Sequence, residues 1–208
     1  MFDISKKLSD SLFQWLASRR YGSPIDEHTL ISRDIVEIFT WDKGVLNDPN
    51  DLSELEARKY ELKNTDRKTT DIPNDLQVVV NMMVDGGLNA YGKNRTGESI
   101  KTNVNALFGT GTTGELATNT QIETQVLAKS FTTDGSRQNI DASFQEKYLM
   151  PVLDTDYTGS LTEAGLADGP APPTDTLITR YTFTAVTISA VQLAQFLTTV
   201  TKQRGIVA

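Results

Sequence analysis

The chain has 208 residues, enough for one hydrophobic core with an appended arm, and it carries 27 Asp and Glu against 20 Lys and Arg, a formal net charge of -7. This acidic balance opposes attraction to nucleic-acid phosphates and to anionic lipid, so we expect no nucleic acid and no membrane among its partners. The sequence contains no cysteine, which excludes disulfides and thiolate metal sites. No segment approaches the ~20 apolar residues of a membrane span, so we expect a soluble, unprocessed chain.

The first 20 residues predict an amphipathic helix with an apolar stripe formed by Leu8, Leu12, Trp15 and Leu16. Two uses of this stripe remain open. It covers one edge of the chain's own core, or it docks onto a neighbouring subunit.

Residues 34–41 (DIVEIFTW) predict a short strand. Residues 51–66 (DLSELEARKYELKNTD) are dense in helix formers and charge with few apolar positions to bury, which predicts a solvated helix or a helical linker. We therefore assign residues 1–75 to a mixed, mainly helical N-terminal arm. His28 is the only histidine and lies in this arm, so the sequence offers no histidine cluster for a metal.

The composition changes at residue 76 to short β-rich segments separated by Gly, Asp or Pro. Residues 76–208 therefore predict a mainly β domain, an antiparallel β-sandwich. A Pro-rich stretch at residues 164–176 predicts an exposed loop. The expected strands cover residues 76–84, 104–108, 126–133, 140–149, 158–166, 177–188 and 191–201.

The expected strand at residues 177–188 shows a two-residue alternation. Tyr181 and Phe183 alternate with Arg180 and Thr182, as in a strand with one face on the core and one in solvent.

A glycine-rich run follows the expected strand at residues 104–108. Gly109, Gly111 and Gly114 fit the dinucleotide pattern G-x-G-x-x-G, and Asp134 lies 20 residues after Gly114, where a ribose-binding acid would be needed. The preceding strand is not continuously apolar, the following segment is rich in threonine, and no second βαβ pattern follows. These features favour a structural turn in which glycine supplies positive φ.

The same run begins like a phosphate-binding loop but departs from it at the decisive positions. Glu115 and Leu116 stand where lysine and a hydroxyl residue are needed, so a carboxylate would face the phosphates. Thr120 and Glu123 fit a capping box, which predicts a short helix starting at Thr120. We expect no cofactor.

Residues 154–165 begin like a calcium-binding loop, with Asp154 and Asp156 at the first and third positions. The twelfth position is Gly165, where a bidentate carboxylate is required, so the segment favours a turn between two strands over a metal site. We identify no catalytic constellation and predict a protein that is not an enzyme.

Three segments of the β half together resemble a diffuse group of structural proteins from tailed bacteriophages and archaeal tailed viruses. The turn Gly109–Thr113 is similar to their G-x-G-T-T motif, Leu161–Leu166 to their I-T-E-x-G-L strand, and Arg180–Phe183 to their R-x-T-F strand. In the segment between them, Asn119 replaces the expected Asp and Ile122 the expected Leu. The resemblance covers about residues 76 to 201.

This resemblance implies a β-sandwich that assembles and performs no chemistry. It predicts a virion protein at the capsid surface, as a decoration or turret, or at the head–tail neck, which forms a homo-oligomer and binds capsid, portal, neck or tail proteins. The alternative is a tail-fibre or baseplate component that binds a host receptor or glycan through the Pro-rich loop and the two tryptophans, although Trp15 and Trp41 lie outside the β half.

Overall fold

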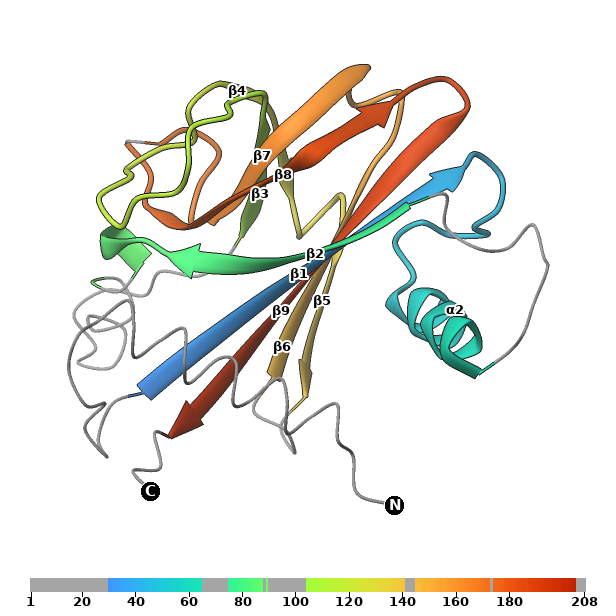
Figure 1. Ribbon diagram of the computed structural model, residues 1–208, viewed down its shortest axis with the longest axis horizontal. Coiled ribbons are helices and arrows are strands. Elements are labelled where there is room, and N and C mark those ends of the chain that lie inside the picture. The colour runs from blue at the N-terminus through green and yellow to red at the C-terminus, as the bar shows by residue number, and fades with distance from the viewer. Residues whose placement is uncertain are drawn as a thin grey trace. The chain divides into compact units, whose positions relative to one another are not determined.

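The computed structural model describes residues 30–64, 75–87, 89, 104–140, 145–172 and 174–204 (Figure 1). The expected N-terminal helix with Leu8, Leu12, Trp15 and Leu16, and also His28, lie outside the described residues. The chain divides into two units, Met1–Ile31 with Lys202–Ala208, and Ser32–Thr201. The second unit contains almost all of the described residues.

The regular structure of the described residues includes nine strands and the helix α2. They are β1 (Leu30–Asp42), α2 (Leu52–Asn64), β2 (Asp75–Met83), β3 (Asn105–Gly109), β4 (Gln125–Ser130), β5 (Ser136–Ile140), β6 (Gln145–Val152), β7 (Gly159–Ala167), β8 (Leu177–Ile188) and β9 (Gln192–Arg204).

The strands form two antiparallel layers that share one strand. Their order is β4-β3-β7-β8-β2-β1-β9-β6-β5, and β2 pairs with β1 over Asp75–Asn81 but with β8 only at Met82 and Met83. We call β4, β3, β7 and β8 sheet I, and β1, β9, β6 and β5 sheet II. The expected mainly β, sandwich-like fold is confirmed.

The main core lies between the two sheets. Phe108 of β3 in sheet I and Phe196 of β9 in sheet II have ring centroids 4.8 Å apart, and Phe183 of β8 lies 5.5 Å from Phe196. Each fully buried side chain of this kind contributes about 1.5–3 kcal/mol relative to its exposed state. The buried members come from β1, β3, β6, β7, β8 and β9, together with Phe131 from the segment after β4.

The outer face of sheet II is also apolar, and α2 covers it. Trp41 and Phe39 of β1 point away from the main core and pack with Leu52 and Leu55 of α2. Asp51 starts this helix by accepting a hydrogen bond from the Ser53 amide at 2.8 Å. The helix was expected, but its expected solvated character is only partly right, since two leucines at i and i+3 suffice to dock it.

The predicted boundary at residue 75 falls inside the unit Ser32–Thr201. The physical reason is strand pairing, because β1 pairs with β2 along seven register positions and β9 lies on its other side. Thus β1 and α2, which the sequence places in the arm, belong to the sandwich.

Candidate functional site

A buried ion pair joins two neighbouring strands of sheet I. Glu163 on β7 and Arg180 on β8 have exposed fractions of 0% and 2%. The carboxylate Oε2 accepts hydrogen bonds from Arg180 Nε at 3.1 Å and Nη2 at 2.9 Å. Removing two charges from water is costly, so such a pair persists only where further hydrogen bonds satisfy both groups.

Those further bonds come from the loop that contains the glycine run, residues 110–124, which we call the glycine loop. Glu163 Oε1 accepts from the amides of Gly111 at 3.0 Å and Thr124 at 2.7 Å. Its Oε2 accepts from the Glu123 amide at 2.9 Å. One carboxylate therefore holds both ends of the loop.

The guanidinium of Arg180 binds the middle of the same loop. Its Nη2 donates to the carbonyl of Thr113 at 3.0 Å, and its Nη1 donates to Asn119 Oδ1 at 3.0 Å and to the carbonyl of Gly114 at 3.3 Å. Arg180 was expected on a solvated strand face. It is buried instead, because the glycine loop covers that face of sheet I.

A second carboxylate closes the loop from its outer side. Glu123 Oε2 accepts from the amides of Thr112 at 3.0 Å and Thr113 at 2.9 Å. The hydrogen bonds from Thr113 are the main reason that the pKa of Glu123 lies below its usual value, and Arg180 adds a smaller effect. Asn119 Oδ1 likewise accepts from the Leu116 amide at 2.7 Å.

The expected helix from Thr120 is wrong. Gln125 already begins β4, and the amides of Glu123 and Thr124 donate to Glu163, whereas in a helix the Thr124 amide would bind the Thr120 carbonyl. The buried carboxylate therefore keeps this segment non-helical. Ile122 is buried with Leu107 of β3 and fixes the loop on the outer face of sheet I.

Two glycines of the run, Gly109 and Gly111, allow close approach of neighbouring atoms, and the expected positive φ is wrong for all three. Among the described glycines, Gly44 and Gly159 have a positive φ. A Cβ on Gly111 would lie 2.5 Å from Glu163 Oε1, and a Cβ on Gly109 would lie 2.5 Å from the carbonyl oxygen of Thr124. Gly114 has open space at the corresponding position.

Three acidic residues fit ligand-binding patterns in the sequence, Asp134 the dinucleotide pattern and Asp154 and Asp156 the calcium-loop pattern. Each of them binds a partner within the protein. Asp134 accepts from the Ser130 amide at 3.0 Å and caps the turn after β4. Asp154 forms an ion pair with Lys43 at 2.8 Å, which is the main cause of its lowered pKa, and Asp156 pairs with Lys129 at 2.5 Å. Residues 153–158 form the expected turn between two strands, β6 and β7.

The Pro-rich stretch begins as a strand and ends as a loop. Residues 164–167 belong to β7, and the loop follows from residue 168. Gln125 Nε2 donates to the carbonyl of Pro170 at 2.8 Å, so this loop contacts the first residue of β4. Trp41 is fully buried under α2, so its ring cannot stack on a sugar at the protein surface.

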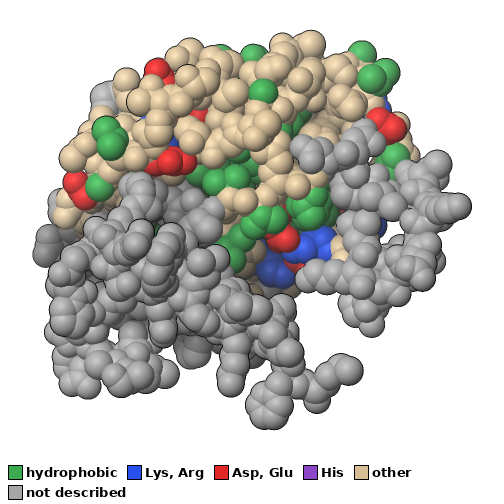
Figure 2. Space-filling model, viewed as in Figure 1, with side chains coloured by type: hydrophobic (Ala, Val, Ile, Leu, Met, Phe, Trp, Pro, Cys, Tyr) green, Lys and Arg blue, Asp and Glu red, His purple; other side chains and the backbone are tan. Residues whose placement is uncertain are grey.

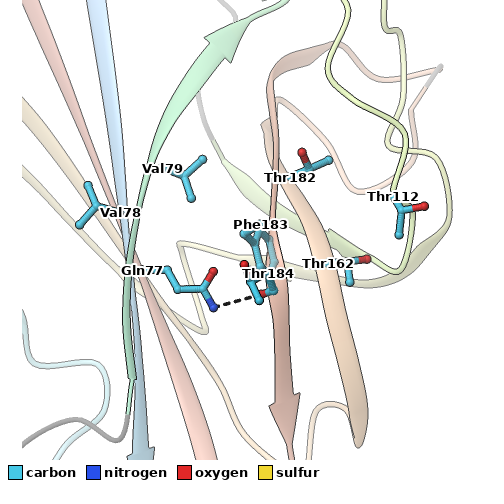
Figure 3. A pocket seen from close by; sticks show the side chains of 8 residues that line it. All are labelled: Gln77, Val78, Val79, Thr112, Thr162, Thr182, Phe183 and Thr184. Carbon is cyan, nitrogen blue, oxygen red and sulfur yellow. Dashed lines mark hydrogen bonds between the residues drawn. The ribbon is translucent and has the colours of Figure 1, made fainter. Parts of the chain in front are cut away.

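A groove of about 580 Å³ opens beside the glycine loop, between β2 and β8 (Figure 3). Its lining consists of Gln77, Val78, Val79, Thr112, Thr162, Thr182, Phe183 and Thr184. Gln77 points across the groove and donates to the carbonyl of Thr184 at 3.1 Å. The sequence gives no sign of this groove, because it arises where two long strands diverge.

The ion pair, by contrast, left a signal that sequence reasoning did not use. Glu163 is the only charged residue of β7, and Arg180 is the only charged residue of β8. Single opposite charges in two otherwise uncharged strands are typical of a buried pair.

No family model matches the sequence, and no curated protein or solved structure matches it either. Within the described residues, no helix combines the length and apolar character needed for a membrane crossing.

Proposed function

We propose that this chain is a non-enzymatic structural protein of a tailed-virus particle, which builds a symmetric assembly at the capsid surface or the head–tail neck. One observation carries the proposal. The three segments that carry the resemblance, residues 109–113, 161–166 and 180–183, meet at the Glu163–Arg180 pair. The resemblance therefore lies on one physically connected unit of the fold.

This unit suits a protein that assembles. The glycine loop is bound at its ends by Glu163 and at its middle by Arg180, so it is ordered before any partner arrives. A surface that is already ordered loses less conformational entropy on association, which favours tight packing between subunits. The partners would be further copies of this chain and other virion proteins.

The outer edge of sheet I restricts how copies can meet. Lys129 lies on the edge strand β4 and has an exposed fraction of only 7%. Its ammonium group donates to Asp156 in the turn after β6. An inward-pointing charge on an edge strand opposes open-ended pairing of sheets. Closed, symmetric contacts are then favoured over fibres.

Immunogold labelling of intact virus particles with an antibody raised against this chain tests the proposal. We expect label on the capsid shell or at the neck, and the same antibody preabsorbed with purified chain should give none. Label confined to the tail tip would favour the fibre or baseplate alternative. Particles without label would contradict a virion role.

A further inference from the structure

Strands β2 and β8 are neighbours for only two register positions and then separate. Met82 pairs with Arg180 and Met83 with Thr179, whereas residues 75–81 of β2 pair with β1 on the other side. Strand β8 pairs with β7 on its other side, with a register irregularity opposite Thr162, where residues 183–185 of β8 have no register partner. A wedge-shaped split therefore opens between the sheets, and it contains the groove shown in Figure 3.

Side chains occupy backbone groups of β8 that face this split. Glu115 Oε1 accepts from the Thr182 amide at 2.6 Å and from the Thr182 hydroxyl at 2.9 Å. Gln77 Nε2 donates to the carbonyl of Thr184. A paired strand would bind these same backbone groups through its own amides and carbonyls, so the two side chains stand in for a missing strand.

The Gln77 side chain bridges the split. When extended it spans about 5 Å from Cα to Nε2 by ordinary bond lengths. Its hydrogen bond to Thr184 adds 3.1 Å, so the bridge reaches beyond the ~4.8 Å between paired strands, and β2 and β8 do not pair at these residues.

The chemistry of the split selects an uncharged occupant. Every residue that lines the groove is uncharged, although the chain as a whole has a net charge of -7. Val79 and Phe183 supply apolar surface, and threonine hydroxyls supply hydrogen bonds. An acidic segment would be repelled by the net charge of the chain and by the Glu115 carboxylate at Thr182, and its own charge would lose water without an opposite charge in the lining.

The lip of the split carries exposed apolar side chains. Val78 and Leu76 on β2 have exposed fractions of 62% and 46%. Figure 2 shows hydrophobic side chains gathered in the middle of the face that β2 crosses in Figure 1. The two outer strands differ: β4 holds the inward Lys129, and β5 has the exposed polar residues Arg137, Gln138 and Asn139.

We propose that the split between β2 and β8 accepts one extended, uncharged segment of a neighbouring protein chain as an added β-strand, which displaces Glu115 and Gln77 from β8. Main-chain hydrogen bonds to both strand edges would hold the segment, and Phe183 and Val79 would contact its inward side chains. The inference rests on the proposed function only in that the donor would be another virion protein.

A fluorescein-labelled, end-blocked peptide SVTVTVS tests strand addition on the purified full-length chain by fluorescence anisotropy. We expect saturable binding, at least about tenfold weaker binding of the peptide SVTDTVS, and a similar loss in the Val78→Asp variant. The matched control is Val191→Asp, because Val191 is exposed to 67% and does not line the groove. That variant should bind as the parent does.

The Gln77→Ala variant distinguishes binding of the peptide as an added strand from its non-specific adsorption to apolar surface. If the peptide displaces Gln77, removal of one hydrogen bond of ~1 kcal/mol should tighten binding about fivefold. Absence of saturable binding, equal loss in both aspartate variants, or an unchanged affinity in Gln77→Ala would overturn the inference. Peptide binding by a chain whose antibody labels no particle would contradict the virion proposal and leave the strand site standing.

Discussion

At the scale of single residues, the Glu163 carboxylate has the most demanding position in the described structure. It is fully buried and accepts hydrogen bonds from three backbone amides and from Arg180. A buried pair of this kind is weak evidence for net stability, but loss of one partner leaves the other charge buried and unpaired.

Glu163→Gln should therefore destabilise the protein by about 3–5 kcal/mol, because a neutral amide leaves the Arg180 charge uncompensated and presents a donor to other donors. Urea unfolding followed by circular dichroism measures this difference. The control is Asp154→Asn, which breaks the exposed pair with Lys43 and should cost far less stability. Equal losses in the two variants would contradict the role given to Glu163.

Gly111→Ala and Gly114→Ala form a second matched pair. A methyl group at Gly111 would lie 2.5 Å from the Cβ of Glu123 and from Glu163 Oε1, so overpacking should cost about 1–3 kcal/mol. Gly114 has open space, and alanine there should change stability by no more than about 0.5 kcal/mol. Thermal unfolding of both variants checks the order, and a Gly111→Ala protein as stable as the parent would show that the loop can relax.

At the scale of elements, the amides of the glycine loop already bind two carboxylates of this chain, Glu123 of the loop itself and Glu163 of β7. The amides of Gly111, Thr112 and Thr113 donate to Glu163 or Glu123. A nucleotide phosphate would have to displace these groups. The nucleotide-like spacing of glycines thus has a structural explanation.

We predict no change in melting temperature with ATP, GTP, NAD or NADP. A ligand present at ~100 times its dissociation constant would stabilise the fold by about 2.7 kcal/mol. At ~2–4 °C per kcal/mol, the resulting shift would be several degrees and easily detected by differential scanning fluorimetry. A saturable shift with any of the four would mean that the loop opens to bind phosphate.

Helix α2 makes stability depend on acidic pH through Glu54. Burial raises the pKa of Glu54, but hydrogen bonds from Arg58 and the amides of Asp48 and Asn47 outweigh it, so the folded pKa lies below 4.5. Its stabilising contribution is present above pH 4.5 and is lost as the pH falls through the folded pKa. The Glu54→Gln variant should lose less stability than the parent protein between pH 5 and pH 3. Urea midpoints measured at each pH test this. Parallel plots of midpoint against pH for the two proteins would contradict it.

Most elements were predictable because each carries a local signal. Strand β8 coincides with the expected residues 177–188, since its β-branched and aromatic residues favour a strand. Strand β5 was missed because Ser136–Ile140 is mostly polar and gains its structure by pairing with β6. The Glu163 site could not be assembled from sequence, because its parts lie on β7, β8 and a loop that meet only in the fold.

At the scale of the whole molecule, the proposed function requires association. Static light scattering of the purified chain at increasing concentration should give a closed oligomer of fixed mass, because a symmetric assembly has a defined end point. A strictly monomeric chain that also fails to bind capsid, portal or tail proteins would count against an assembly role. A mass that grows without limit would contradict closed symmetry.

The position of β9 between β1 and β6 has a kinetic consequence. Strands β1 and β9 begin at Leu30 and Gln192, so sheet II cannot close until segments that are distant along the chain have met. Closing so long a loop costs entropy before any contact compensates for it, and folds dominated by non-local pairing are slow, with folding times in the range of milliseconds to seconds. Until β9 arrives, β1 and β6 both expose unpaired edges and Trp41 lacks the cover of Leu193 and Leu197. A chain in this state would expose both strand edges and apolar surface to other chains, the features that promote aggregation during folding.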